Sequence, residues 1–251
     1  MRSILTSVQK SCTLLKLFLN AEKELGVSDL SRKLQISKGA VHKLLITLES
    51  EGFIKQNPNN KLYSLGYTLL ELGTKVKDNH DWAEFAKPSI QKLADYTKEL
   101  ACFCIIDGQD AMYIDKIESQ YPIRFNVEAY RRFPLYATSA SRVILAYCSP
   151  EMIDQVLSQP FKQYTPYSIT DPEEMKQRLA KIRQLGYEIS SNLRNIGVTG
   201  IAAPIFDAEG KVAASISLIG PTDRMTQNLD HWADTVVQTT QKLSRHFGYK
   251  L

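Results

Sequence analysis

Cysteine is scarce in this chain, and its copies are scattered. The 251 residues include only Cys12, Cys102, Cys104 and Cys148, too few for a disulfide scaffold. Their spacing lacks the paired Cys or Cys/His pattern of a zinc site. Cys102 and Cys104 would share one face of a strand, which favours two core cysteines. We therefore expect reduced thiols in a cytoplasmic protein, with no metal and no cofactor.

Long apolar runs are also missing. No stretch approaches the ~18 uninterrupted apolar residues of a membrane span. Lys10 and Lys16 interrupt the apolar N-terminal segment and no small-residue cleavage site follows, so a secretory signal is not expected. These absences predict a soluble protein with no membrane partner.

Histidine is rare, and its placement argues against catalysis. Residues 81–230 contain no histidine at all, so a Ser-His-Asp arrangement in this half would have to recruit His231 or His246. The sequence also lacks a Gly-x-Ser-x-Gly elbow, a P-loop and a Gly-x-Gly-x-x-Gly motif. We do not expect an enzyme.

The positive charge lies at one end of the chain. Residues 1–80 hold twelve Lys/Arg and seven Asp/Glu, a net charge of +5. The other 171 residues hold nineteen and twenty, a net charge of −1. This asymmetry indicates a module that binds a polyanion, joined to a neutral domain, with a boundary near residue 80.

The first third carries the pattern of a helix-turn-helix. Apolar residues at helical spacing predict a first amphipathic helix: Ile4, Val8, Cys12, Leu15, Phe18 and Leu19. Gly26 breaks the pattern, and Ser28 stands where the N-cap of a short second helix belongs, ending near Gln35. Ser37 is expected to cap a third helix of about a dozen residues.

The expected third helix has two unlike faces. Its apolar stripe would face a core: Val41, Leu44, Leu45 and Leu48. Its other face is small, polar or basic and holds no acid: Lys38, Gly39, His42, Lys43 and Thr47. Small Gly39 and Ala40 would let the backbone N–H groups of the first turn meet phosphate. Such a helix fits a major groove, although an ordinary helical hairpin with a solvated face is the alternative.

A hairpin follows at once. Phe53–Gln56 and Lys61–Leu65 are expected as strands around the turn residues 57–60, which completes a winged helix. Lys55 and the turn would lie near the wing tip, where they could touch the DNA backbone or minor groove. The candidate DNA contacts are Ser28, Ser37, Lys38, Gly39, Ala40, His42, Lys43, Thr47, Asn59, Asn60 and Lys61.

The second half alternates helices and strands. Helices are expected over residues 67–77, 82–98, 139–147, 151–157, 172–185 and 227–246. Strands are expected over 100–107, 111–117, 123–128, 187–190, 201–207 and 212–218. Antiparallel strands with flanking helices indicate an α+β domain.

Two blocks of motifs cover nearly the whole chain. The first comprises residues 27–45, 51–54, 63–66 and 69–73, and the second 134–138, 197–198, 201–204, Gly210 and Gly220-Pro221. With these motifs the chain resembles the isocitrate-lyase-regulator (IclR) family of bacterial transcription factors. The resemblance implies a winged helix-turn-helix at 1–66, a linker helix at 67–80 and an effector-binding domain at 81–251 with a GAF or profilin-like sheet. The chain has Gly39-Ala40 where the family usually has Ser-Thr, and Lys43 where it has Arg.

The resemblance also implies where an effector binds. In the family, pockets for small organic acids use the helix start at Ser139, the loop 190–200 and the strand at Ser217. The candidate ligand contacts are Phe125, Ser139, Ala140, Ser141, Asn192, Val198, Gly200, Ser215 and Ser217. A helix N-terminus favours an anion, although the serines could instead be caps and turn formers.

Two departures from the family pattern bear on this pocket. The chain has Ser141-Arg142 where the family commonly has Gly-Lys. It has Asn192-Leu193 where the family commonly has a pair of acids, which some members use for metal, so no metal is expected. Asn192 beside Arg194, and Arg142 near the helix start, favour an anionic effector.

The sequence thus predicts a DNA-binding transcriptional regulator controlled by a small-molecule effector, an organic acid. Its partners would be a double-stranded DNA operator, the effector and copies of itself, as a homodimer or a dimer of dimers, because helix-turn-helix proteins read paired half-sites. The apolar first helix is a candidate dimer surface. The alternative is an enzyme or sensor whose winged helix contacts only protein, and the acid-free third helix argues against it. We expect repression, but the sequence does not decide between repression and activation.

Overall fold

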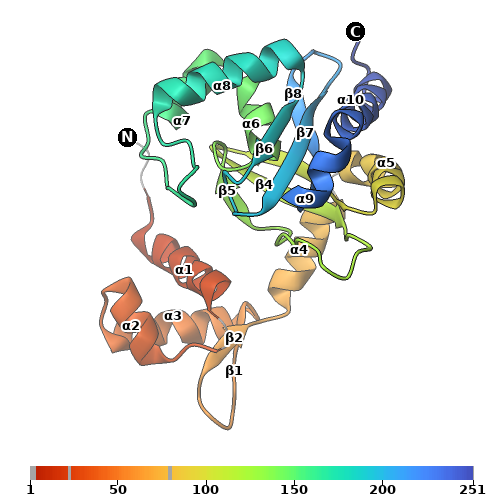
Figure 1. Cartoon of the computed structure of the whole chain (residues 1–251). Coiled ribbons are helices and arrows are strands. Elements are labelled where there is room, and N and C mark those ends of the chain that lie inside the picture. Colours follow the sequence, from red (N-terminus) through yellow and green to blue (C-terminus); the bar gives the residue numbers. More distant parts are fainter. Residues whose placement is uncertain (1–3, 22–23, 79–80, 251) are drawn as a thin grey trace. The chain divides into compact units, whose positions relative to one another are not determined.

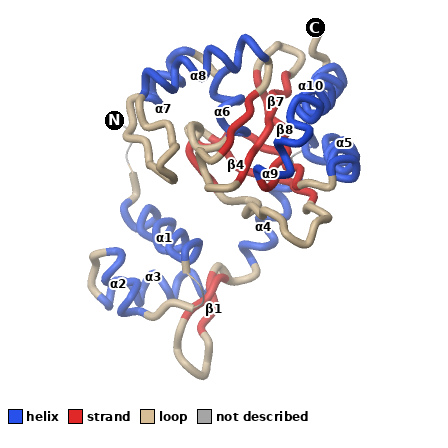
Figure 2. The backbone as a smooth tube through the Cα atoms, viewed as in Figure 1, coloured by secondary structure: helices blue, strands red, loops and turns tan. Residues whose placement is uncertain are grey.

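The chain forms two compact units, residues 1–80 and 81–251. The computed structural model describes residues 4–21, 24–78 and 81–250, and Figures 1 and 2 show the elements of both units. None of the described helices is long and apolar enough to cross a membrane.

The N-terminal unit is a winged helix-turn-helix, as predicted. Its helices are α1 (Thr6–Leu17), a short 3₁₀ helix (Phe18–Asn20), α2 (Val27–Leu34), α3 (Lys38–Ser50) and α4 (Thr68–Asp78), and its hairpin is β1 (Ile54–Gln56) with β2 (Tyr63–Leu65). Leu14, Leu30, Val41, Leu45 and Ile54 are buried together in its core. Residues 79–80, at the expected end of the linker helix, lie outside the described residues.

The turn between α2 and α3 follows from two local features. Gln35 takes a left-handed conformation (φ 54°), which ends α2. The Ser37 side chain then accepts a hydrogen bond from the Ala40 N–H at 3.2 Å and so caps α3, as predicted.

One expectation in this unit is wrong. The N-cap of α2 is Gly26 rather than Ser28, because the Gly26 carbonyl accepts the first helical hydrogen bond, from the Leu30 N–H. The N-terminal helical segment packs inward through Leu14 of α1 and Phe18 of the 3₁₀ helix, whereas Ile4 and Val8 of the predicted stripe are 67% and 55% exposed. Only the C-terminal part of α1 reaches the core, so most of the predicted stripe is left on the surface.

The C-terminal unit is built on a six-stranded sheet in which every neighbouring pair is antiparallel. The strand order is β5-β4-β3-β8-β7-β6. The strands are β3 (Leu100–Asp107), β4 (Asp110–Ile117), β5 (Arg132–Pro134), β6 (Glu188–Ser191), β7 (Val198–Phe206) and β8 (Val212–Pro221). With its helices, this sheet gives the predicted α+β fold.

Helices cover both faces of the sheet. On one face lie α6 (Ser139–Ala146), α7 (Pro150–Leu157) and α8 (Pro172–Leu185), which share a core with Cys102 and Cys104. On the other lie α5 (Asp81–Thr97) and α10 (Leu229–His246), preceded by α9 (Thr222–Met225) and a 3₁₀ helix (Thr226–Asn228). Alternating β3 residues therefore point into two different cores, since successive strand side chains face opposite ways.

The expected strand at 123–128 is absent, and a short strand that was not expected takes its place. Residues 123–128 run without strand pairing, and the Lys116 ammonium holds this segment through the Asn126 side chain and the Val127 carbonyl. Pairing resumes at β5, where Pro134 lies opposite Asp110. The local pattern at 123–128 suits a strand, but the outer edge of β4 forms its backbone hydrogen bonds with Tyr130 and β5 instead.

Candidate functional site

The outer face of α3 is open to solvent. Lys38, Gly39, His42, Lys43 and Thr47 are all exposed, whereas the other side of the helix is buried in the core. A Cβ at Gly39 would meet nothing within 4 Å, so the first turn has free space around it. This face presents two lysines and no acid, which suits phosphate and base edges.

At the wing, one carboxylate holds the turn. The Glu24 carboxylate accepts hydrogen bonds from the side-chain amides of Asn57 (3.0 Å) and Asn60 (2.7 Å), which keep the pKa of Glu24 below its ordinary value. Asn60 Oδ1 also accepts from the Leu62 N–H at 2.9 Å. The Asn60 side chain therefore stabilises the wing turn. Asn59 and Lys61, the other two candidate DNA contacts at the wing, are exposed, and Asn59 contacts the turn through its backbone N–H.

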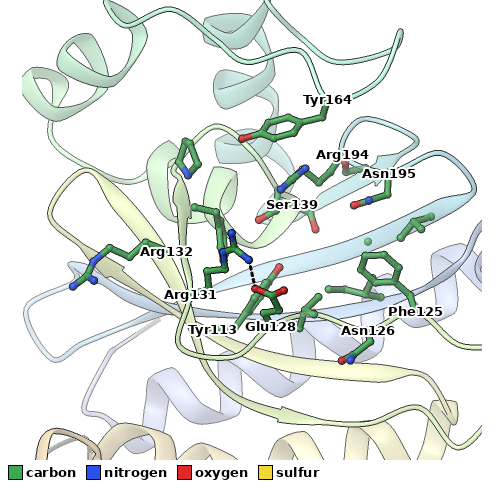
Figure 3. Close-up of a pocket in the computed structure, with 18 of the residues that line it drawn as sticks. Tyr113, Phe125, Asn126, Glu128, Arg131, Arg132, Ser139, Tyr164, Arg194 and Asn195 are labelled. Carbon is green, nitrogen blue, oxygen red and sulfur yellow. Dashed lines mark hydrogen bonds and ion pairs between the residues drawn. The ribbon is translucent and has the colours of Figure 1, made fainter. Parts of the chain in front are cut away.

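The C-terminal unit contains a cavity of about 610 Å³ beside α6 (Figure 3). This volume is in the range of small-molecule sites. Irregular segments supply much of its lining, and β4, β5, the start of α6, β6, β7 and β8 supply the rest. The lining residues are Tyr113, Phe125, Asn126, Val127, Glu128, Arg131, Arg132, Phe133, Pro134, Thr138, Ser139, Lys162, Tyr164, Ser190, Arg194, Asn195, Val198, Gly200 and Ile219.

Four of the candidate ligand contacts line this cavity: Phe125, Ser139, Val198 and Gly200. Gly200 lies so close to α6 that a Cβ there would be 2.6 Å from Ser139 Oγ. A side chain at position 200 would therefore displace Ser139 and narrow the cavity.

The other five candidates do not line the cavity: Ala140, Ser141, Asn192, Ser215 and Ser217. Three of them have hydrogen bonds that stabilise the fold around it. Ser141 forms a capping box with Thr138 at the start of α6. Ser215 Oγ donates to the carbonyl of buried Ala140 at 2.9 Å. Asn192 has a left-handed backbone and accepts from the Gly197 N–H at 2.7 Å, so it shapes its own loop.

Arg142 is not a cavity residue, contrary to the expectation that it attracts an anion. Its side chain is 2% exposed and its Nε lies 2.8 Å from Glu188 Oε1, so its charge is matched inside the core. It also donates to the Tyr136 carbonyl and to Ser190 Oγ. Arg142 touches the cavity only through Ser190, which lines it.

Four other cations line the cavity: Arg131, Arg132, Lys162 and Arg194. Only Arg194 was singled out from the sequence, because the others stand in segments without a motif. Glu128 is the acid among the lining residues, so the lining carries a net charge of 4 − 1 = +3. Such a lining favours an anion.

The two units match two known domains. Residues 7–58 match the IclR helix-turn-helix domain, and residues 74–245 match the bacterial transcriptional regulator IclR C-terminal domain. The chain belongs to the IclR family of bacterial transcriptional regulators.

Known regulators and solved structures are similar to this chain over nearly its whole length. The HTH-type transcriptional regulators KipR of Bacillus subtilis (35% identical over 246 residues, 97% of each chain) and XynR of Escherichia coli (32% over 248 residues, 98% of each) are similar in sequence. The solved IclR regulator of Alicyclobacillus acidocaldarius is 26% identical, with a TM-score of 0.84 over 98% of this chain and 100% of the other. These relatives support a DNA-binding regulator over the alternative in which the winged helix contacts only protein.

The relatives of this IclR protein are regulators, which points to a protein that is not an enzyme. Over residues 4–21, 24–78 and 81–250, no group of three or more His, Cys, Asp or Glu side chains is arranged to hold a metal ion. The structure therefore directs attention to two surfaces, the α3 face with its wing and the cavity beside α6.

Proposed function

We propose that this IclR regulator binds a double-stranded DNA operator through α3 and the wing, and that a small organic acid in the C-terminal cavity controls the binding. The observation that carries the first part is the exposed, acid-free face of α3 within a winged helix-turn-helix. On this proposal residues 1–66 bind DNA, 67–80 form the linker and 81–251 bind the effector. The protein acts in the cytoplasm, where the chromosome is accessible.

The net positive lining of the cavity supports an organic acid as effector. An IclR homologue from Microbacterium hydrocarbonoxydans, 20% identical with a TM-score of 0.84, has been solved with 4-hydroxybenzoate. It shares the fold, and its ligand is of the proposed class. The acid would bind two conformations of the domain unequally and so change operator affinity.

Self-association follows from how helix-turn-helix proteins read DNA, with paired half-sites bound by paired copies. Three exposed apolar side chains support the α1 segment as a contact between copies: Ile4 just before α1, Val8 in α1 and Leu19 in the 3₁₀ helix that follows. We propose a homodimer or a dimer of dimers. Repression is the proposed mode, supported by the similarity to the Escherichia coli transcriptional repressor AllR (26% identical over 227 residues).

The test is selection of bound duplexes from a random DNA pool by the purified full-length protein. Enrichment of a palindrome or near-palindrome is the expected result, because two copies would read two half-sites. If no sequence is enriched at low salt, with or without organic acids, specific DNA binding is excluded.

A further inference from the structure

Three segments without regular secondary structure contribute to the lining of the cavity: residues 118–131, 158–171 and 192–197. Figure 3 shows Phe125 and Asn126 of the first segment and Arg194 and Asn195 of the third around the cavity. Such segments lack the ladder of backbone hydrogen bonds that fixes a helix or a strand, so other contacts must hold them.

The second and third segments are bonded to each other. Thr165 Oγ1 donates a hydrogen bond to the Asn192 carbonyl at 2.7 Å. The guanidinium carbon of Arg194 lies 3.6 Å from the centroid of the Tyr164 ring, which places the cation over the aromatic face. We therefore expect these two segments to move together.

The third segment is bonded in turn to the short helix α9. The Thr222 N–H donates to the Gly197 carbonyl at 2.8 Å, and Thr222 Oγ1 accepts from Thr199 Oγ1 at 3.0 Å. Met225, at the other end of α9, is fully buried in the core that the sheet shares with α5 and α10. A movement of the third segment therefore acts on a helix that is anchored on the opposite face of the sheet.

Arg224 of α9 holds a buried carboxylate. Its Nε lies 2.5 Å from Glu99 Oε1 and its Nη2 lies 3.0 Å from Glu99 Oε2. Glu99 is fully buried where α5 passes into β3, and a Cβ on Gly220 would lie only 2.7 Å from Oε2. A buried carboxylate without a counter-charge is costly, so this pair is either formed or broken and has no gradual range between.

The first segment meets the same pair at its N-terminal end. The guanidinium carbon of Arg224 lies 4.2 Å from the centroid of the Tyr121 ring. Beside it, the Gln120 N–H and Ser119 Oγ both donate to the Lys98 carbonyl at 2.9 Å, at the end of α5. The contacts of all three segments thus converge on Arg224, Glu99 and the C-terminal end of α5.

We propose that the Arg224–Glu99 pair is the junction through which the cavity controls α5. A ligand that moves the cavity segments shifts α9 and changes the pair, and the pair displaces the end of α5. This helix begins at Asp81, directly after the linker residues, and a helix carries a displacement along its length. Arg224 does not line the cavity, so it acts as a positioning residue. This inference rests on the proposed effector role of the cavity.

The first test is hydrogen–deuterium exchange of the free full-length protein, followed by mass spectrometry. Arg224→Gln should speed exchange about tenfold in both the first and the third segment, because it releases α9 from Glu99 and from Tyr121. Tyr121→Leu removes only the ring and leaves the buried charges matched. It should speed exchange about threefold or more in the first segment and also in the third, on the other side of the junction.

Arg183→Gln is the control. Arg183 is an exposed arginine of α8 that donates to the Ala146 carbonyl at the C-terminal end of α6, so its loss also removes a bond between two elements. It should leave exchange in both segments unchanged. Peptides from β7 report on unfolding of the whole unit, and Tyr121→Leu should not alter them. Exchange in the third segment that stays unchanged in both Arg224→Gln and Tyr121→Leu would refute the junction.

The second test uses the reciprocity of coupled binding sites. Adding the operator duplex obtained by selection should change exchange in the first and third segments at least twofold in the unmodified protein and in Arg183→Gln. Arg224→Gln should still bind the duplex, since this residue belongs to the C-terminal unit, but its cavity segments should no longer respond.

The outcomes separate this inference from the proposed function. A duplex that binds without changing either segment would refute transmission through the pair while DNA recognition stands. Cavity segments that still respond in Arg224→Gln would refute the role of Arg224. If no duplex is enriched, the proposed function fails and the transmission fails with it, whereas exchange of the free protein still decides whether Arg224 joins the segments.

Discussion

Nε of Arg142, on α6, lies 2.8 Å from Oε1 of Glu188, on β6, and solvent reaches almost none of either side chain. Arg178 of α8 binds the same carboxylate. Because Arg142 also donates to Ser190, the cavity wall is bonded to an ionic network that joins two helices to the edge of the sheet.

Removing one partner of this pair should cost more than removing both. Glu188→Met leaves Arg142 buried without a counter-charge, and we expect a loss of about 3–5 kcal/mol in the free energy of unfolding. Adding Arg142→Met should recover part of that loss. Urea unfolding followed by tryptophan fluorescence measures it, since Trp82 and Trp232 both belong to this unit. Losses that simply add would contradict the coupling.

Lys43→Ala should weaken operator binding and flatten its dependence on salt. Loss of one phosphate contact lowers the slope of log affinity against log salt by about 1. Fluorescence anisotropy at several salt concentrations measures both quantities. Lys181→Ala, an exposed lysine on α8, is the matched control and should leave both unchanged.

Glu24→Ala should lower operator affinity even though it removes a negative charge from the DNA-binding unit. Losing the hydrogen bonds to Asn57 and Asn60 frees the wing turn, and we expect roughly a fivefold loss of operator affinity. Glu71→Ala, an exposed acid on α4, controls for charge and should not lower affinity. An affinity gain with Glu24→Ala would mean that charge outweighs wing geometry.

The contact between the Glu24 carboxylate and the wing turn stabilises the fold only over a defined range of pH. Because the pKa of Glu24 is lowered from 4.5, the folded state favours the carboxylate. Its contribution is present above the unfolded pKa and is lost as pH falls through the lower folded value. The wing should therefore stay in place at neutral pH.

The C-terminal unit should lose stability in alkali through its buried thiols. Burial raises the pKa of Cys104 from 9.0 to about 12, so above pH 9 the thiol ionises in the unfolded chain and not in the folded one. At pH 10 this costs on the order of 1 kcal/mol of unfolding free energy relative to pH 8. Cys104→Val removes the ionisable group and should lose less stability over that interval in chemical unfolding. An equal loss would show that Cys104 does not contribute.

Local signals predicted the elements well. The Ser37 cap and the apolar stripe of α3 depend on residues within a few positions of each other, and α8 has the predicted bounds, set by Pro172 and by Gly186 in a left-handed conformation. The expected strands, with helices on either side of them in the sequence, correctly predicted an antiparallel sheet.

Partners far apart in sequence escaped prediction. No local pattern around Arg142 indicates its partner Glu188, which lies 46 residues away. The sequence therefore predicted that this core arginine attracts an anionic effector. Glu24 lies 36 residues from Asn60, whose side chain was expected to face DNA. The cations around Tyr164 escaped notice because the loops that carry them meet only in the folded domain.

All eight residues of α6 are buried, so this helix offers no position where a substitution goes unnoticed. The cavity cations Arg131, Lys162 and Arg194 stand instead on segments outside helices and strands. Side chains there can change without disturbing the packing of the sheet. Substitutions at these loop positions are therefore expected to change the charge of the cavity while leaving the packing of α6 intact.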